Sequence, residues 1–194
     1  MSAPAKPVPP KPVPPRPGVG APAARLAEIL RVDHAGELGA VHIYRGQRAV
    51  LGVVERHAQV SDQLRRMGEQ EAEHLRAFDA LLTQRGVRPS LLTPLWRAAG
   101  LALGVGTALL GEKAAHACTE AVESVIEGHY AEQIAELAEQ EPELAGALSR
   151  FRDEELEHHD LAVEEGAREA PAYPLLSTLI RAGCRAAIRI SEKV

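Results

Sequence analysis

Residues 71–74 read EAEH and residues 155–158 read ELEH, so the pattern Glu-x-x-His occurs twice in the chain. On a helix, this spacing places the Glu and the His of each motif on one face, a turn apart. Both side chains of a motif could therefore bind one metal ion. A single Glu-x-x-His is a weak signal in a chain rich in glutamate, so its meaning depends on what accompanies it.

Two isolated glutamates turn the motif into a repeat. Glu37 precedes Glu71 by 34 residues, and Glu123 precedes Glu155 by 32. Each half is predicted to be an antiparallel helical hairpin, with a lone Glu on its first helix and Glu-x-x-His on its second. The midpoint of each interval falls at an expected turn, so each lone Glu should lie level with its Glu-x-x-His.

Two such hairpins would bring four glutamates and two histidines to the centre of a four-helix bundle. This is the ligand pattern of di-iron carboxylate bundles. Carboxylates with one imidazole per ion suit iron or manganese better than zinc, and burying these groups without a metal would be costly. The alternative is a set of solvated charges on acidic helices, which a matched set in both halves disfavours. The predicted metal ligands are Glu37, Glu71, His74, Glu123, Glu155 and His158.

The composition predicts an all-α fold in one domain. Ala, Leu, Glu and Arg dominate the 194 residues, and aromatic residues make up only 3%. Ser61 with Asp62 is a candidate cap for the second helix, Gly86 should follow its end, and Pro142 should begin the fourth. The expected division is a first hairpin over 24–84, an apolar connector over 91–111, a second hairpin over 112–168 and an amphipathic C-terminal helix over 173–191.

The N-terminal segment is expected to stand apart from the domain, which would cover 23–194. Residues 1–22 hold nine of the fourteen prolines and predict a disordered, partly polyproline-II tail without the apolar stretch of a signal peptide. The two cysteines, Cys118 and Cys184, are far apart and form no CxxC. We therefore expect neither a disulfide framework nor a cysteine zinc site, and a reducing, intracellular setting.

Charge is distributed unevenly along the chain. The net charge is −5, but residues 1–24 and 171–194 each carry +3, which leaves −11 for the middle. An acidic body does not suit nucleic acid, which requires a basic face. It suits a body that binds cations and a terminus that meets an anionic surface.

Two segments raise the question of a membrane. Residues 98–111 carry no charge but are too short to span a bilayer, so they form either a packed connector or a segment that dips into a membrane surface. On a helical wheel Arg181, Arg185 and Arg189 share one side of the C-terminal helix. This pattern favours a helix in an anionic membrane interface, and the alternative is an ordinary surface helix. The apolar side comprises Leu176, Leu179, Ile180, Ala187 and Ile190.

Four stretches resemble one family. They are RVDHAGELGAVHIYRGQ (31–47), EQEAEHLRAFDALL (69–82), CTEAVESVIEGHYAEQI (118–134) and FRDEELEHHDLA (151–162). They resemble the demethoxyubiquinone hydroxylase family of ubiquinone biosynthesis over about residues 25–194. The resemblance implies a ferritin-like fold, two iron ions on the six ligands named above, and a peripheral place on the cytoplasmic side of the cell membrane. It also implies that His129 and Tyr130 act as proton or electron relay groups.

The implied reaction is the hydroxylation of 2-polyprenyl-3-methyl-6-methoxy-1,4-benzoquinol with O₂. The implied partners are this quinol, an electron donor such as NADH or a reductase, the membrane surface and other proteins of ubiquinone biosynthesis. The main alternative is a ferritin-like iron-oxidising or peroxide-scavenging protein, which would share the metal site but need no membrane-facing apolar segment. A purely structural or adaptor protein is a further alternative, and it would function without metal.

Overall fold

The computed structural model describes residues 21–53 and 55–193, and within them it contains six α-helices and no strand. The predicted all-α fold is therefore confirmed. Residues 1–20, which hold most of the tail predicted to be disordered, lie outside the described residues. The helices are α1 (Ala21–Leu51), α2 (Ala58–Arg85), α3 (Thr93–Leu109), α4 (Glu112–Leu137), α5 (Pro142–Glu164) and α6 (Tyr173–Ser191), with 3₁₀ turns at Glu55–His57 and Ala167–Glu169.

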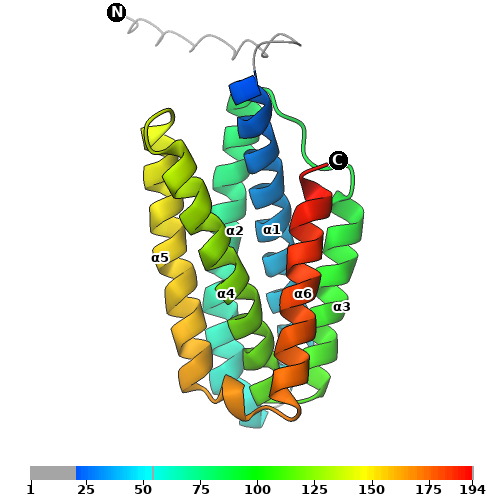
Figure 1. The fold of residues 1–194 in the computed structure, drawn as a ribbon. Helices are drawn as coiled ribbons and strands as arrows, with labels where there is room; N and C mark the ends of the chain where they lie inside the picture. Colours follow the sequence, from blue (N-terminus) through cyan, green and yellow to red (C-terminus); the bar gives the residue numbers. More distant parts are fainter. Residues whose placement is uncertain (1–20, 54, 194) are drawn as a thin grey trace, which may run out of the picture.

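Four of these helices form the ferritin-like bundle. α1 packs against α2, and α4 packs against α5, so each half of the chain is an antiparallel hairpin (Figure 1). α3 lies along α1 and α6 lies along α4, so these two helices stand beside each other on one side of the bundle (Figure 1). α1 and α4 run in opposite directions, which relates the two hairpins by an approximate two-fold axis.

The helix boundaries follow local chemistry at most ends. Gly86 adopts φ 64° after α2, and its N–H bonds back to carbonyls of the last turn, as its position predicted. Pro142 is the first residue of α5, as predicted. The predicted cap at Ser61 and Asp62 was wrong, because α2 already begins at Ala58. Asp62 instead accepts hydrogen bonds from arginines one turn further along the helix.

Glycines explain why α3 can lie so close to α1. A Cβ atom on Gly100 would meet the carbonyl oxygen of Gly39 at 2.5 Å, and one on Gly104 would clash with the carbonyl of Ile43. On α1, a Cβ on Gly46 would meet the carbonyl oxygen of Leu101 at 2.5 Å. Gly100 and Gly104 therefore serve helix-to-helix packing, which brings the two backbones into direct contact.

The bundle core is divided by its polar centre. At one end, Leu30, Phe78 and Leu148 are fully buried, and they pack with neighbours from α1, α2, α4 and α5. At the other end, Leu64 and Met67 form a second cluster with Tyr44. The polar side chains between these two clusters belong to the site.

Candidate metal centre

The six predicted ligands converge between the two apolar clusters. They come from α1, α2, α4 and α5, and each is at most 3% exposed. They form two overlapping groups, in each of which one donor atom per residue lies within 4.8 Å of the others. The first group is Glu37, Glu71, His74 and Glu155, and the second is Glu71, Glu123, Glu155 and His158. Glu71 and Glu155 belong to both groups, which is the arrangement that two bridged metal ions require.

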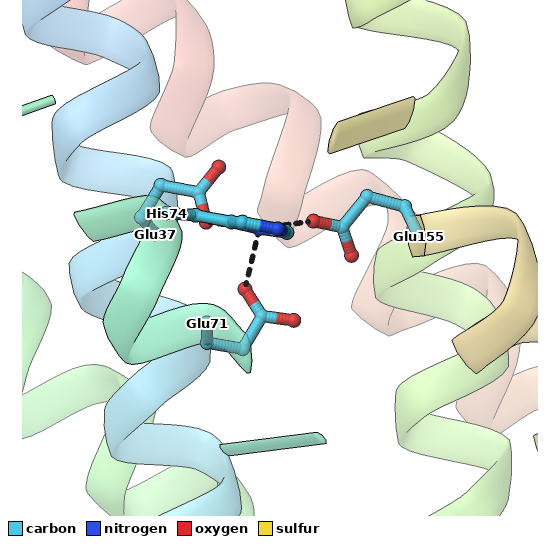
Figure 2. Close-up of side chains that lie close together, drawn as sticks. All are labelled: Glu37, Glu71, His74 and Glu155. Atoms are coloured by element: carbon cyan, nitrogen blue, oxygen red, sulfur yellow. Dashed lines mark ion pairs between the residues drawn. The ribbon is translucent and has the colours of Figure 1, made fainter. Parts of the chain in front are cut away.

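Figure 2 shows the first group, in which three carboxylates from three helices surround one imidazole. Nδ1 of His74 lies 3.1 Å from Oε1 of Glu155, 3.4 Å from Oε2 of Glu37 and 3.9 Å from Oε2 of Glu71. In the second group, Nδ1 of His158 lies 3.1 Å from Oε1 of Glu71 and 3.4 Å from Oε2 of Glu155. Each group thus contains one imidazole nitrogen surrounded by carboxylate oxygens.

The donor atoms of the cluster fit a metal. Buried polar atoms are normally hydrogen-bonded, yet seven buried atoms of the cluster make no hydrogen bond. A cation among them would satisfy these atoms, because ionised carboxylates cannot donate hydrogen bonds to one another. The oxygen-rich set with one nitrogen per group suits iron or manganese. The seven atoms are Oε2 of Glu37, both oxygens of Glu71 and Glu155, and Nδ1 of His74 and His158.

Electrostatics also favour a cation here. Burial raises the pKa values of Glu71 and Glu123 well above the usual range, and repulsion from Glu155 adds to this rise. Burial also opposes ionisation of Glu155, but attraction to the neighbouring His158 and His74 imidazoles outweighs it and lowers its pKa to about 2. Burial disfavours the His74 cation, yet the neighbouring carboxylates raise its pKa to about 11. Divalent ions would replace the protons that these groups otherwise retain.

The outward-facing nitrogens of both histidines are held by neighbours on the opposite hairpin. Nε2 of His74 donates to Oε2 of Glu154 over 2.6 Å, and Nε2 of His158 donates to Oε1 of Gln70 over 2.9 Å. Because Nε2 carries the proton, Nδ1 offers its lone pair to the centre of the cluster. Neither Glu154 nor Gln70 was predicted from the sequence as part of the site.

Two tyrosines complete the site in a crossed arrangement. Tyr130 on α4 donates a hydrogen bond to Oε1 of Glu37 on α1, and Tyr44 on α1 donates to Oε1 of Glu123 on α4 over 2.8 Å. Tyr130 was predicted through the family resemblance, whereas Tyr44 was missed. A signal was present, because Glu-x₆-Tyr-x₂-Gln begins at Glu37 and again at Glu123.

His129 lies beside the cluster rather than within it. It is partly buried, and its Nε2 lies 2.9 Å from Nε2 of Gln133 and 3.6 Å from Oδ1 of Asp33. Gln133 in turn donates to Oδ1 of Asp33 over 2.8 Å. These three residues form a polar chain that runs from the partly exposed His129 to α1, one helical turn before Glu37.

Comparison with known proteins identifies the family. The family model of ubiquinone biosynthesis protein COQ7 matches residues 24–191. The chain belongs to the COQ7 family. It is similar to the 3-demethoxyubiquinol 3-hydroxylase of Rhodospirillum rubrum, with 55% identity over 173 residues that cover 89% of this chain and 80% of the relative.

Eukaryotic organisms also have similar COQ7-family members. The human NADPH-dependent 3-demethoxyubiquinone 3-hydroxylase, mitochondrial, is 49% identical over 175 residues, which cover 88% of this chain and 79% of the relative. The 5-demethoxyubiquinone hydroxylase, mitochondrial, of Saccharomyces cerevisiae is 42% identical over 189 residues, with coverages of 90% and 80%. The family resemblance found in the sequence motifs is thus confirmed.

This COQ7-family chain also contains an apolar cavity of about 500 Å³ beside the cluster. α1 contributes small residues, including Gly36 and Ala40, and α3 and α6 contribute larger ones such as Trp96, Leu103 and Leu179. Aliphatic, glycine and alanine side chains dominate the lining, so the cavity suits a hydrocarbon ligand rather than a polar one. The glycines on its α1 side leave room that larger side chains would fill.

In the C-terminal helix α6 of this COQ7 member, one side chain does not lie where the helical wheel predicted. Arg181 does not join Arg185 and Arg189 on the exposed face, because its Nη2 donates to Oε1 of buried Glu120 over 2.7 Å. Leu179 of the same helix is 62% exposed, and Arg185 and Arg189 are free of ion pairs with the described residues. Among the described residues, no helix combines the length and the apolar character needed to cross a membrane.

Proposed function

We propose that this chain is a di-iron monooxygenase that hydroxylates demethoxyubiquinol, a polyprenyl methoxybenzoquinol, at its unsubstituted ring carbon. The names of the COQ7-family relatives support this assignment. The reaction converts a ring C–H into C–OH and consumes O₂, two electrons and two protons. One oxygen atom enters the ring and the other leaves as water. The electrons come from a reduced nicotinamide or a reductase, and the human relative is named as NADPH-dependent.

The observation that carries this proposal is the position of α1 between the cluster and the cavity. Glu37 points into the cluster, while its neighbours Gly36 and Ala40 line the cavity. Ile126, one turn after Glu123 on α4, lines the same cavity. A hydrocarbon-tailed quinol in the cavity would therefore lie next to the helix segments that carry the two lone carboxylates.

The six residues would hold two iron ions, with Glu37 and His74 at one position, Glu123 and His158 at the other, and Glu71 and Glu155 shared by both groups. When bound, the irons supply the redox chemistry that activates O₂. The protein keeps the site dry and fixes each imidazole through the hydrogen bond at its Nε2. Tyr44 and Tyr130 each hold a proton at Oη, directed at a lone carboxylate.

Proton supply is assigned to the polar chain of His129, Gln133 and Asp33. His129 is the most exposed of the three, so it can exchange protons with solvent, and Asp33 lies one turn before Glu37 on α1. Tyr130 follows His129 in the sequence and reaches Glu37 directly. We assign both residues a relay role, as their place in the family motif implies.

A membrane-embedded substrate would explain the apolar face formed by α3 and α6. Large side chains remain exposed there, and the free arginines of α6 could contact anionic headgroups. We therefore assign the protein to the cytoplasmic side of the cell membrane as a peripheral protein, with residues 23–194 as one di-iron domain. The exposed side chains are Leu95, Leu101, Leu175, Leu179 and Ile190.

Complementation of a bacterial strain that lacks its demethoxyubiquinol hydroxylase tests the proposal. The wild-type gene should restore the hydroxylated quinone and remove the accumulated demethoxy precursor, measured by quinone profiling. Glu71→Ala and Glu155→Ala should fail to do so. The matched controls are Glu73→Ala and Glu157→Ala, because both side chains are exposed on the same helices. Full restoration by Glu71→Ala or Glu155→Ala would refute the proposal, and soluble cages with iron-oxidising activity would favour the ferritin-like alternative.

A further inference from the structure

The two halves of the cluster are related by the internal repeat, but the residues that hold the two histidines differ. Gln70 precedes Glu71 on α2, and Glu154 precedes Glu155 on α5. Each contacts the histidine of the other hairpin, so Glu154 holds His74 and Gln70 holds His158. The repeat therefore places a carboxylate behind one imidazole and an amide behind the other.

This difference changes how strongly each imidazole can bind a cation. A carboxylate that accepts the Nε2 proton draws it more strongly than a neutral amide does, and the donor-acceptor distance is correspondingly shorter, 2.6 Å against 2.9 Å. The electron density left on the ring makes Nδ1 a better donor to a metal. Glu154 also brings an additional negative charge to the His74 half.

The predicted ligands of the two halves are matched in type. Each half has one lone carboxylate, which accepts a hydrogen bond from one tyrosine, and both share Glu71 and Glu155. Each imidazole Nδ1 has two carboxylate oxygens at 3.1 and 3.4 Å, from Glu155 and Glu37 around His74 and from Glu71 and Glu155 around His158. The histidine partners, in contrast, differ in charge between the two positions.

We propose that Glu154 is a positioning residue that makes the two metal positions unequal, so that the position of Glu37 and His74 fills before that of Glu123 and His158. This inference rests on the proposed two-metal site. Loss of such a histidine partner typically weakens metal binding by about 10- to 100-fold. The two positions should therefore differ in affinity by about this factor.

The chain offers a reciprocal pair of variants to test this. Glu154→Gln makes both partners amides, and Gln70→Glu makes both partners carboxylates. Both side chains are partly exposed, and neither lies in the packed core. The double variant Glu154→Gln/Gln70→Glu exchanges the two partners while retaining the composition and net charge of the wild type.

Titration of the full-length metal-free protein with Mn²⁺, with free Mn²⁺ followed by electron paramagnetic resonance, gives the binding steps directly. We expect two steps about 10- to 100-fold apart in the wild type, two weak steps in Glu154→Gln and two tight steps in Gln70→Glu. The double variant should again show two separated steps. Adding Glu37→Gln to the wild type should remove the tight step, and adding it to the double variant should remove the weak one.

The results that would overturn the inference are distinct from those that would overturn the proposed site. Two equal steps in the wild type, or isotherms that neither Glu154→Gln nor Gln70→Glu alters, would refute the unequal positions and leave the two-metal site intact. If Glu37→Gln removes the tight step in the double variant as well as in the wild type, the role of Glu154 would also be refuted. A wild-type chain that binds no Mn²⁺ would refute the inference and the proposed site together.

Discussion

The hydroxyl of Tyr44 on α1 donates a hydrogen bond to Glu123 on α4 over 2.8 Å. Tyr130 on α4 makes the equivalent bond to Glu37 on α1. Each tyrosine lies seven residues after the lone glutamate of its own helix, and the two helices are antiparallel, so the two bonds cross the bundle in opposite directions. Each bond occupies one oxygen of a lone carboxylate, and Oε2 of Glu37 is left without a hydrogen bond.

Tyr44→Phe should weaken metal binding in the half that contains Glu123. Without the phenol, the carboxylate loses a hydrogen bond to a charged group, worth about 1.5 kcal/mol at least, and its orientation is no longer fixed. We expect about tenfold weaker binding of one of two Mn²⁺ equivalents, measured by calorimetric titration. Tyr173→Phe, the control, removes the only tyrosine outside the site. Equal isotherms for Tyr44→Phe and Tyr173→Phe would show that the bond does not position Glu123.

Gly104→Ala should destabilise the packing of α3 on α1. The added methyl group would clash with the backbone of Ile43, which cannot move as a flexible side chain could. Overpacking of this kind costs about 1–3 kcal/mol. Gly106→Ala is the control, because nothing lies within 4 Å of its Cβ position, and replacing an exposed helical glycine should stabilise by up to about 1 kcal/mol. Urea unfolding that ranks the two variants in the opposite order would contradict the close contact.

The rate of Cys184 alkylation should depend on pH and on whether the cavity is occupied. Burial, followed by the charge of Glu123, raises the pKa of this thiol to about 11. Only the thiolate reacts, so the rate should rise about tenfold for each pH unit from pH 8 to 10. The measurement uses Cys118→Ala, which leaves Cys184 as the only thiol. A prenylated quinone should slow the reaction, because Cys184 lines the cavity. A rate that levels off near pH 8.5 would contradict the raised pKa, and a rate that the quinone does not change would contradict the place of Cys184 in the cavity wall.

Reversing the two free arginines of α6 should weaken binding to anionic vesicles. A basic residue near such a surface contributes about 1 kcal/mol, so Arg185→Glu/Arg189→Glu should bind about 30-fold more weakly in a flotation assay. Arg181 is left unchanged because its ion pair with Glu120 is structural. Arg76→Glu/Arg150→Glu has the same net charge and alters exposed positions on α2 and α5. Equal binding by both double variants would mean that α6 does not face the membrane.

The sequence permitted prediction of the fold and of the six converging side chains, because both follow from helix periodicity and a repeated spacing. Tyr44 was missed because a tyrosine two turns after Glu37 on a helix also fits an ordinary core position. The partners of His74 and His158 were missed for a related reason. Glu154 and Gln70 look like surface residues until the bundle places them against the opposite hairpin.

Contacts between distant parts of the chain explain the remaining differences. The helical wheel placed Arg181 with the exposed arginines, since it contains no information about Glu120, which lies 61 residues earlier. Residues 98–111 were predicted to be either a packed connector or a membrane-dipping segment, and only the packed structure shows that Gly100 and Gly104 lie against α1. The cavity likewise depends on four helices at once, and none of them reveals it alone.

The central claim is that these six side chains hold two iron ions, and counting bound iron tests it most directly. The full-length protein is loaded anaerobically with Fe²⁺, freed of excess, and analysed for iron per chain beside Glu71→Gln and the exposed control Glu73→Gln. The proposed site predicts two irons per chain in the wild type and in Glu73→Gln. It predicts less than one in Glu71→Gln, because both positions share Glu71. Absence of bound iron in the wild type, or two irons retained in Glu71→Gln, would contradict the claim.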